Sequence, residues 1–225
     1  MEFDASLDIV IGESKITRNN FSTNSETQSC AFPSGGLLSI ITLTKRENVG
    51  SERRDIIVSE TTTSISAIPF SKSGNSIAVG EDSPNSRVFI LTFSGNNYDD
   101  IESKIVVYTK EKGFSCLALD YSNHRLITVG SDSKPYLLLW DIGNPNPTII
   151  GYYQLSIVPN HISICDNFAL VSGNKMLKII HFDINFKGTP IALKHTNANI
   201  ETYKTQKFIS VACDSENCYA LSSNG

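Results

Sequence analysis

Short apolar segments separated by polar turns make up most of the chain. Runs of five to eight residues rich in Ile, Val, Leu, Thr, Phe and Tyr alternate with clusters of Ser, Asn, Asp, Gly and Pro. No stretch of ten or more residues has the i, i+3, i+4, i+7 apolar spacing of an amphipathic helix. The pattern therefore predicts an all-β protein. The predicted strands are 37–43, 55–59, 64–70, 76–80, 87–93, 104–108, 114–120, 125–130, 136–142, 148–154, 161–165, 168–172, 176–182, 207–213 and 219–222.

The strand pattern repeats along the chain. Residues 65–93 and 114–142 share one layout: an alternating strand, a polar turn, a second strand ending in Val-Gly, a loop with Asp, and a third strand. The two Val-Gly pairs end at Gly80 and Gly130, 50 residues apart. A compressed copy contains Gly173, a partial copy ends the chain, and an imperfect one precedes the first. One further strand follows each copy, and the last of these is expected at residues 190–194.

Four antiparallel strands in a unit of about 40–50 residues are typical of a β-propeller blade. A β-sandwich also has short strands, but it does not repeat one internal layout at this period. We predict a WD-repeat propeller with four to five blades: approximately 16–59, 60–108, 109–154, 155–195 and a partial 196–225. A seven-blade propeller needs roughly 280–350 residues. The chain is therefore expected to be a fragment of a larger propeller, or one that another segment closes, because open sheets expose strand edges.

The single tryptophan lies at the end of the third strand of the best-formed unit. In a WD-repeat blade, a Trp at this place donates its indole N–H to a Ser or Thr on the second strand, and an Asp and a His complete the relay. Thr128 and Asp132 are at matching positions, but the Gly-His dipeptide is missing from 109–114, TKEKGF. We predict structural roles, in preference to ligand stacking. The predicted structural residues are Thr128, Gly130, Asp132, Trp140, Asp141, Gly80 and Gly173.

Composition and charge narrow the classes of partner. The formal net charge is −4 and the isoelectric point is near 5.6, so binding to nucleic acid is not expected. The acidic N-terminus does not resemble a secretory signal, and the apolar runs are too short to span a membrane. Five scattered cysteines without a CxxC motif indicate free thiols in a reducing compartment, and we expect a cytoplasmic protein. We expect no metal and no cofactor.

No catalytic motif is evident. The four histidines, His124, His161, His181 and His195, lack the spacing of a metal site or a catalytic dyad. The chain has no G-x-S-x-G, Walker or G-x-G-x-x-G motif. The Asp-box pattern of propeller glycosidases fails in 131–140, which lacks the required Gly and Thr. A propeller hydrolase with paired carboxylates stays open as the less favoured alternative, because the predicted innermost strands are apolar.

Several segments together resemble one family. In order, residues 31–43, 60–91, 112–142, 172–183 and 212–225 are similar to the N-terminal propeller of the mitogen-activated-protein-kinase-binding protein 1 and WD repeat-containing protein 62 family. The resemblance implies a long scaffold whose C-terminal region engages kinases and centrosomal or cytoskeletal partners at the centrosome or spindle pole. That kinase-docking region would lie beyond Gly225. Divergent ciliary and flagellar WD-repeat proteins are the nearest alternative, which leaves a structural, microtubule-associated subunit open.

We therefore expect a non-catalytic scaffold for protein–protein interaction. Partner contacts are expected in three polar loops, 96–102, 143–147 and 186–192, because loops on a rigid scaffold carry most binding residues. The partners would be other proteins, with neither nucleic acid nor membrane involved. The candidate contact residues are Asn96, Tyr98, Asp99, Asn144, Asn146, Phe186 and Lys187.

Overall fold

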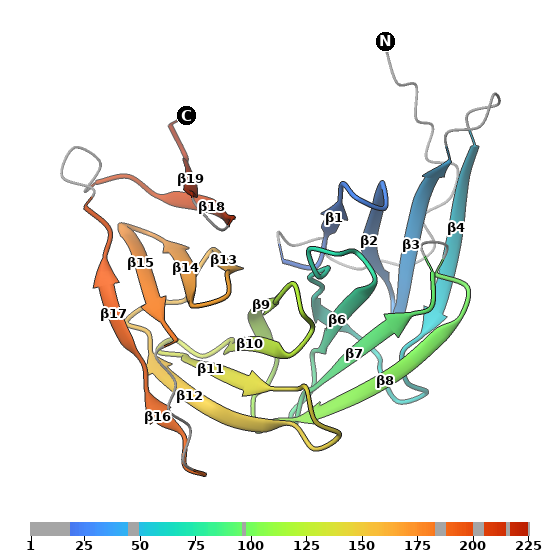
Figure 1. Cartoon of the computed structure of the whole chain (residues 1–225), viewed down its shortest axis with the longest axis horizontal. Coiled ribbons are helices and arrows are strands. Elements are labelled where there is room, and N and C mark those ends of the chain that lie inside the picture. Colours follow the sequence, from blue (N-terminus) through green and yellow to red (C-terminus); the bar gives the residue numbers. More distant parts are fainter. Residues whose placement is uncertain are drawn as a thin grey trace.

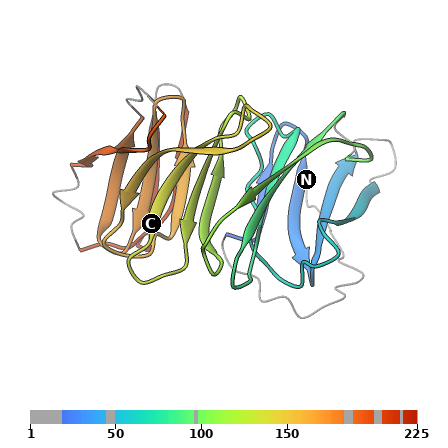
Figure 2. The ribbon, with the colours of Figure 1, turned by 90° about the horizontal axis from the view of Figure 1, so that it is seen from below.

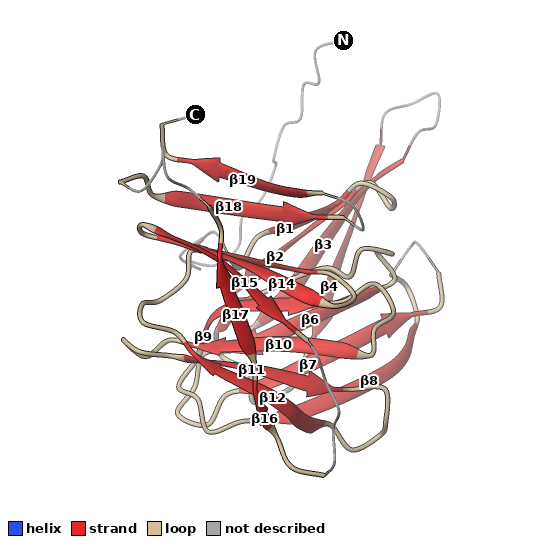
Figure 3. Ribbon diagram, turned by 60° about the vertical axis from the view of Figure 1, so that its left-hand side comes forward, coloured by secondary structure: helices blue, strands red, loops and turns tan. Residues whose placement is uncertain are grey.

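The computed structural model describes residues 19–44, 50–95, 98–182, 188–199, 205–214 and 217–224. Over these residues the chain forms β-strands and turns without a helix (Figure 3). The strands belong to five sheets. Neighbouring strands in these sheets pair antiparallel, except that residues 191–192 pair parallel with the strand at 148–154. The all-β prediction is confirmed.

Each sheet is numbered here as a blade, in chain order. Blade 1 contains β1 (Ser22–Asn24), β2 (Ser29–Ser34), β3 (Leu37–Thr44) and β4 (Gly50–Ile57). Blade 2 contains β5 (Ile65–Ala67), β6 (Ser76–Glu81), β7 (Arg87–Phe93) and β8 (Ile101–Tyr108). Blade 3 contains β9 (Phe114–Leu119), β10 (Arg125–Gly130), β11 (Tyr136–Asp141), β12 (Thr148–Gln154) and β16 (Ile191–Ala192). Blade 4 contains β13 (His161–Ile164), β14 (Phe168–Gly173), β15 (Met176–His181) and β17 (Lys194–Asn197). Blade 5 contains β18 (Phe208–Cys213) and β19 (Cys218–Ser222).

The five sheets stand side by side around a common centre (Figures 1 and 2). The first strand of each sheet is innermost, and the later strands lie progressively farther out. Blades 1 and 5 do not meet, so the arrangement is an open arc. This is the incomplete β-propeller that the repeat period predicts.

The hydrophobic core lies between consecutive blades. One apolar cluster, with Leu38 and Phe89, fills the space between blades 1 and 2. A second, with Trp140, joins blades 2 and 3, and a third, with Leu139, joins blades 3 and 4. Because alternate side chains of a strand point to opposite faces, a sheet packed on both faces buries every position. This explains why all six residues of β6 are buried.

The predicted strand at 190–194 is divided between two blades. Ile191 and Ala192 form β16, which pairs parallel with β12 and gives blade 3 a fifth strand. The next strand, β17, pairs instead with β15 in blade 4. Leu193 separates the two strands, and its buried side chain lies against Gly151, where even a methyl group would come within 2.6 Å of it. The segment is divided because Leu193 is buried between its two strands. The apolar pattern of residues 190–194 does not reveal this packing.

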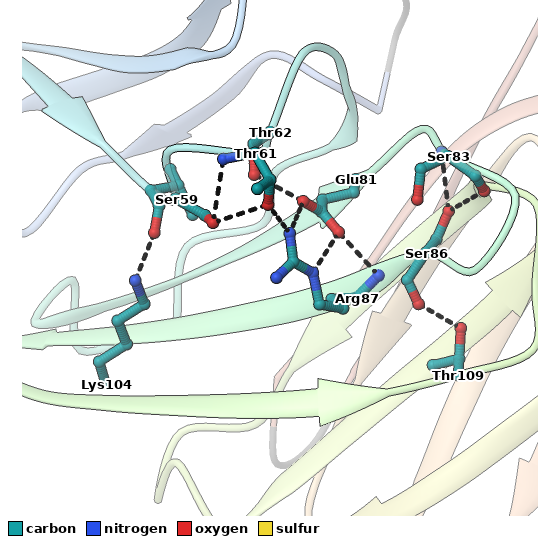
Figure 4. Close-up of polar contacts among 10 residues, drawn as sticks. Ser59, Thr61, Thr62, Glu81, Ser83, Ser86, Arg87, Lys104 and Thr109 are labelled. Atoms are coloured by element: carbon teal, nitrogen blue, oxygen red, sulfur yellow. Dashed lines mark hydrogen bonds and ion pairs between the residues drawn. The ribbon is translucent and has the colours of Figure 1, made fainter.

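An ion pair with a buried carboxylate ties the link between blades 1 and 2 to the β6–β7 turn (Figure 4). The Glu81 side chain is 4% exposed, and its carboxylate accepts hydrogen bonds from Arg87 at 2.6 and 2.7 Å. Thr62, in the link, donates its hydroxyl to the same carboxylate at 2.6 Å. Burial by itself would raise the pKa of Glu81, but the bonds from Arg87 and Thr62 outweigh it and hold the pKa below its usual value. The pair therefore helps to fix how the first two blades pack.

Candidate protein-interaction surface

The tryptophan of blade 3 has a structural environment. The Trp140 side chain is buried, and its indole N–H donates to the Thr128 hydroxyl at 3.0 Å. Asp132 is exposed, and within the described part of the chain its side chain makes no hydrogen bond. Asp141 accepts the Gly143 N–H at 3.0 Å and so fixes the start of the following loop. The relay of blade 3 therefore consists of two residues, Trp140 and Thr128.

The three glycines at the ends of the second strands differ in their surroundings. A Cβ on Gly80 would lie 2.7 Å from the Phe114 ring and 2.9 Å from Leu117, so Gly80 permits the close approach of blades 2 and 3. At Gly130 and Gly173 the nearest atoms belong to the ends of flexible side chains, those of Glu111 and Met176. None of the three glycines has the left-handed backbone that a tight turn requires. Close packing, and not turn geometry, explains the glycine at position 80.

The described parts of the three predicted contact loops lie on one face of the arc. Each covers the connection from the third to the fourth strand, in blades 2, 3 and 4 respectively, but residues 101–102 already belong to β8 and residues 191–192 form β16. Asn144 and Asn146, in the blade 3 loop, are exposed as predicted contact residues should be. Asn96, Phe186 and Lys187 fall outside the described residues.

Tyr98 was predicted to contact partners, and the structure corrects that prediction. The side chain is only 2% exposed, because a positive φ of 56° turns it into the core between blades 1 and 2. Its hydroxyl donates to Thr27 Oγ1 at 2.8 Å and to the Gly74 carbonyl at 3.0 Å. The ring also packs edge-on against Phe93, with 5.0 Å between the centroids. Tyr98 is therefore an internal anchor of the β7–β8 loop.

The neighbouring Asp99 is also engaged within the protein. Its carboxylate lies 2.6 Å from Arg54 Nε, and both side chains are about half exposed. A surface ion pair of this kind stabilises little, about 0–1 kcal/mol. It nevertheless occupies the Asp99 carboxylate, so the first predicted contact loop offers less free polar surface than its sequence indicates.

The Tyr98 hydroxyl allows a direct test of this assignment. Tyr98→Phe is expected to lower the free energy of unfolding by about 1–2 kcal/mol, because Thr27 and the Gly74 carbonyl lose their donor in a buried site. Denaturant unfolding measures the difference. Tyr108→Phe is the matched control, since Tyr108 is 74% exposed; its effect should stay within about 0.5 kcal/mol. Equal effects of the two substitutions would contradict the buried placement of Tyr98.

The β9–β10 turn of blade 3 is a rigid, exposed element on the same face of the arc. The Asp120 carboxylate accepts the backbone N–H groups of His124 and Arg125 at 2.9 and 3.0 Å and the Ser122 hydroxyl at 2.7 Å. These bonds hold the turn in a single shape. Tyr121, in the turn, is 64% exposed. The turn thus presents an aromatic side chain on an ordered backbone.

This turn and the blade 3 loop form one surface. The Ile142 N–H donates to the His124 carbonyl at 2.8 Å. A Cβ on Gly143 would lie 3.3 Å from the His124 ring, so the two segments are in close contact. We call the exposed residues Tyr121, His124, Asn144 and Asn146 the blade 3 end surface. The sequence prediction included both asparagines but missed Tyr121, whose position at the start of a turn after Asp120 was the available signal.

The centre of the arc contains a cavity of about 890 Å³, lined by the innermost strands of blades 1, 3, 4 and 5 and by the segment that follows β5 in blade 2. No carboxylate is among its lining residues in the described part of the chain. His161 is one of the residues that line the cavity. Burial lowers the pKa of this histidine, and its Nδ1 atom contacts the backbone of Val211. Across the described ranges, no three His, Cys, Asp or Glu side chains are placed to hold a metal ion. Among the described residues, the cavity therefore has no carboxylate pair of the kind that glycoside hydrolysis uses.

Comparison with known proteins supports the fold. No model of a known protein family matches the sequence, and no curated protein matches it. Among solved structures, the β-propeller domain of Cps50 (Swd1) from Myceliophteria thermophila is similar, with a TM-score of 0.58 and 12% identity over 88% of this chain and 64% of that one. A chain of the mitotic checkpoint complex is also similar, with a TM-score of 0.52 and 13% identity over 83% and 59% of the two chains. This protein thus has the β-propeller fold and spans less than two thirds of either structure. In the part that the structure describes, no helix is long and apolar enough to cross a membrane.

Proposed function

We propose that this protein is a non-catalytic scaffold that binds other proteins through the blade 3 end surface. The observation that carries the proposal is Tyr121, a 64% exposed aromatic side chain on a turn that the Asp120 carboxylate holds rigid. Tyrosine is enriched at the centres of protein interfaces, because it buries a large area while few torsions lose their freedom. A rigid turn also reduces the ordering cost of binding.

The other residues of the surface suit the rim of an interface. Asn144 and Asn146 are exposed amides that can donate and accept hydrogen bonds around a central aromatic contact. His124 adds a ring beside them, next to Gly143. The surface has no dense positive charge, which supports a protein partner in preference to nucleic acid.

Within this class we propose a cytoplasmic scaffold of the kinase-signalling or centrosome and spindle type. The support is the ordered resemblance of the blade sequences to the mitogen-activated-protein-kinase-binding protein 1 and WD repeat-containing protein 62 family. The two similar structures add general support, because one of them belongs to a complex of several proteins. The alternative, a ciliary or microtubule-associated subunit, predicts direct binding to microtubules. Co-sedimentation of the purified chain with microtubules would favour that alternative.

Quantitative affinity capture tests the proposed surface. Tyr121→Ala is expected to reduce the recovery of protein partners about tenfold or more, as expected for an interface hot spot. Tyr136→Ala is the matched control: Tyr136 is 43% exposed and begins β11, at the opposite end of blade 3. Both variants should fold, since both side chains lie at the surface. Equal recovery of all partners by wild type and Tyr121→Ala would contradict the proposal.

A further inference from the structure

Three of the five cysteines converge where blades 4 and 5 meet. Cys165 directly follows β13, and Cys213 ends β18, the inner strand of the next blade. The Cys165 thiol contacts the backbone carbonyl of Asp214, the residue next to Cys213, so Cys165 reaches the end of the strand that carries Cys213. Cys218 begins β19 and is the direct cross-strand partner of Cys213. Directly opposed residues of an antiparallel pair project from the same face of a sheet, so Cys213 lies between two other thiols.

Neighbouring polar groups hold the sulfurs in this arrangement. Ser163 Oγ lies 3.1 Å from the Cys213 sulfur and accepts the Cys213 N–H, also at 3.1 Å. The Cys165 thiol donates to the Asp214 carbonyl at 3.1 Å. Lys72, from blade 2, places its ammonium group 3.7 Å from the Cys165 sulfur and donates to the Cys213 carbonyl at 2.6 Å. Lys72 therefore contacts both of these cysteine residues.

The three thiols differ in accessibility. Cys165 is 8% exposed and Cys213 is 6% exposed, whereas Cys218 is open to solvent. A dissolved reagent therefore meets Cys218 first. Once a bond has formed between Cys165 and Cys213, external thiols reach it slowly for the same reason.

We propose that Cys218, Cys213 and Cys165 form a thiol relay that is oxidised by a small-molecule disulfide and ends in a Cys165–Cys213 disulfide. In the first step the Cys218 thiolate attacks the small disulfide, forms a mixed disulfide and releases one small thiol. Cys213 then attacks the Cys218 sulfur and releases the second small thiol. Finally Cys165 attacks the Cys213 sulfur, and Cys218 leaves as a thiol. In sum, two protein thiols lose two electrons and two protons, and one small disulfide is reduced to two thiols.

The product would link the innermost strands of blades 4 and 5. In the described residues blade 5 has only two strands, and β18 packs against blade 4. A covalent bond between Cys165 and Cys213 would hold this hairpin in place. Burial, followed by contact with Cys165, raises the pKa of Cys213 to about 12. The reaction is therefore expected to be slow at neutral pH and to accelerate as the pH rises.

Oxidised glutathione and the complete 225-residue chain provide the test. We expect the intact mass to fall by about 2 Da, for two hydrogens lost, and peptide mapping without reductant to join Cys165 to Cys213. Cys218→Ser should slow this bond about tenfold or more, because the exposed entry point is lost. Cys165→Ser should stop the reaction at a Cys213–Cys218 bond. Cys30→Ser, in blade 1, is the control and should leave the rate unchanged.

Three results would overturn the proposal. One is wild-type protein that carries only glutathione adducts, and another is disulfide formation only between molecules. The third is a Cys165–Cys213 bond that forms in Cys218→Ser at the wild-type rate, which would exclude the relay. Mapping of the wild-type chain decides the identity of the bond even when a buried-cysteine variant does not fold.

Discussion

Replacing Arg87 with alanine is expected to lower the free energy of unfolding by about 3–5 kcal/mol, the usual cost of leaving one buried charge without its partner. Glu81 would remain in a site where its side chain is 4% exposed, with only the Thr62 hydroxyl and backbone as donors. The Arg87 side chain also packs over the Phe89 ring, 4.9 Å from its centroid, and that contact would be lost as well. Chemical denaturation followed by circular dichroism measures the change.

Two further variants separate the buried charge from other effects. Arg53→Ala removes an arginine paired with Asp55 at the surface of blade 1, and it should cost about 1 kcal/mol or less. The double variant Glu81→Leu with Arg87→Met removes both charges and should recover most of the loss. If Arg87→Ala were as mild as Arg53→Ala, the Glu81 carboxylate would not be buried as described.

The pH dependence of stability has a definite sign for Glu81. Its pKa is held below the usual value in the folded state, so the unfolded chain takes up this proton at a higher pH than the folded chain does. The stabilisation is therefore present above the ordinary glutamate pKa and is lost as the pH falls through the lowered value. The stability of wild type relative to the double variant should therefore fall as the solution is acidified through that range.

Replacing Trp140 with alanine is expected to cost about 3–5 kcal/mol, because a large buried side chain leaves a cavity between blades 2 and 3. The substitution also leaves the Thr128 hydroxyl, which is fully buried, without its indole donor. Thermal and denaturant unfolding measure the loss. The residue belongs to the core cluster and not to an exposed surface, so capture of protein partners by the folded fraction should be preserved.

The hydrogen bond itself is measured by a double-mutant cycle. Trp140→Phe keeps an aromatic ring but removes the N–H, and Thr128→Val keeps the shape of the partner but removes the hydroxyl. Together the two changes should cost about 0.5–1.5 kcal/mol less than the sum of the single changes. Additive effects would contradict the bond between these two side chains.

The regular parts of the fold were predictable from local pattern. β7, β10 and β12 have the predicted bounds, because turn residues delimit apolar runs of strand length on both sides. The repeated layout also led to the sheet order, since a chain of antiparallel hairpins at a fixed period has few ways to pack. The Trp140–Thr128 bond followed from the same layout.

The remaining features depend on contacts between distant segments. The inward turn of Tyr98 rests on a positive φ, which is uncommon for a bulky residue and leaves no mark in the sequence. The division between β16 and β17 depends on Leu193 packing beside Gly151, some forty residues earlier. The exposure of Tyr121 follows from the bonds of Asp120, and a polar turn sequence does not distinguish an exposed tyrosine from a buried one.

The order in which the blades pack is the central structural claim, and methyl–methyl nuclear Overhauser effects test it most directly. The structure predicts methyl contacts within the clusters that join consecutive blades, such as the cluster that contains Leu38 of blade 1 and Ile77 of blade 2, and the cluster that contains Leu139 of blade 3 and Val171 of blade 4. A pattern of this kind confirms a propeller. Strong contacts between the core methyl groups of blade 1 and blade 3, as two face-to-face sheets would give, would contradict it.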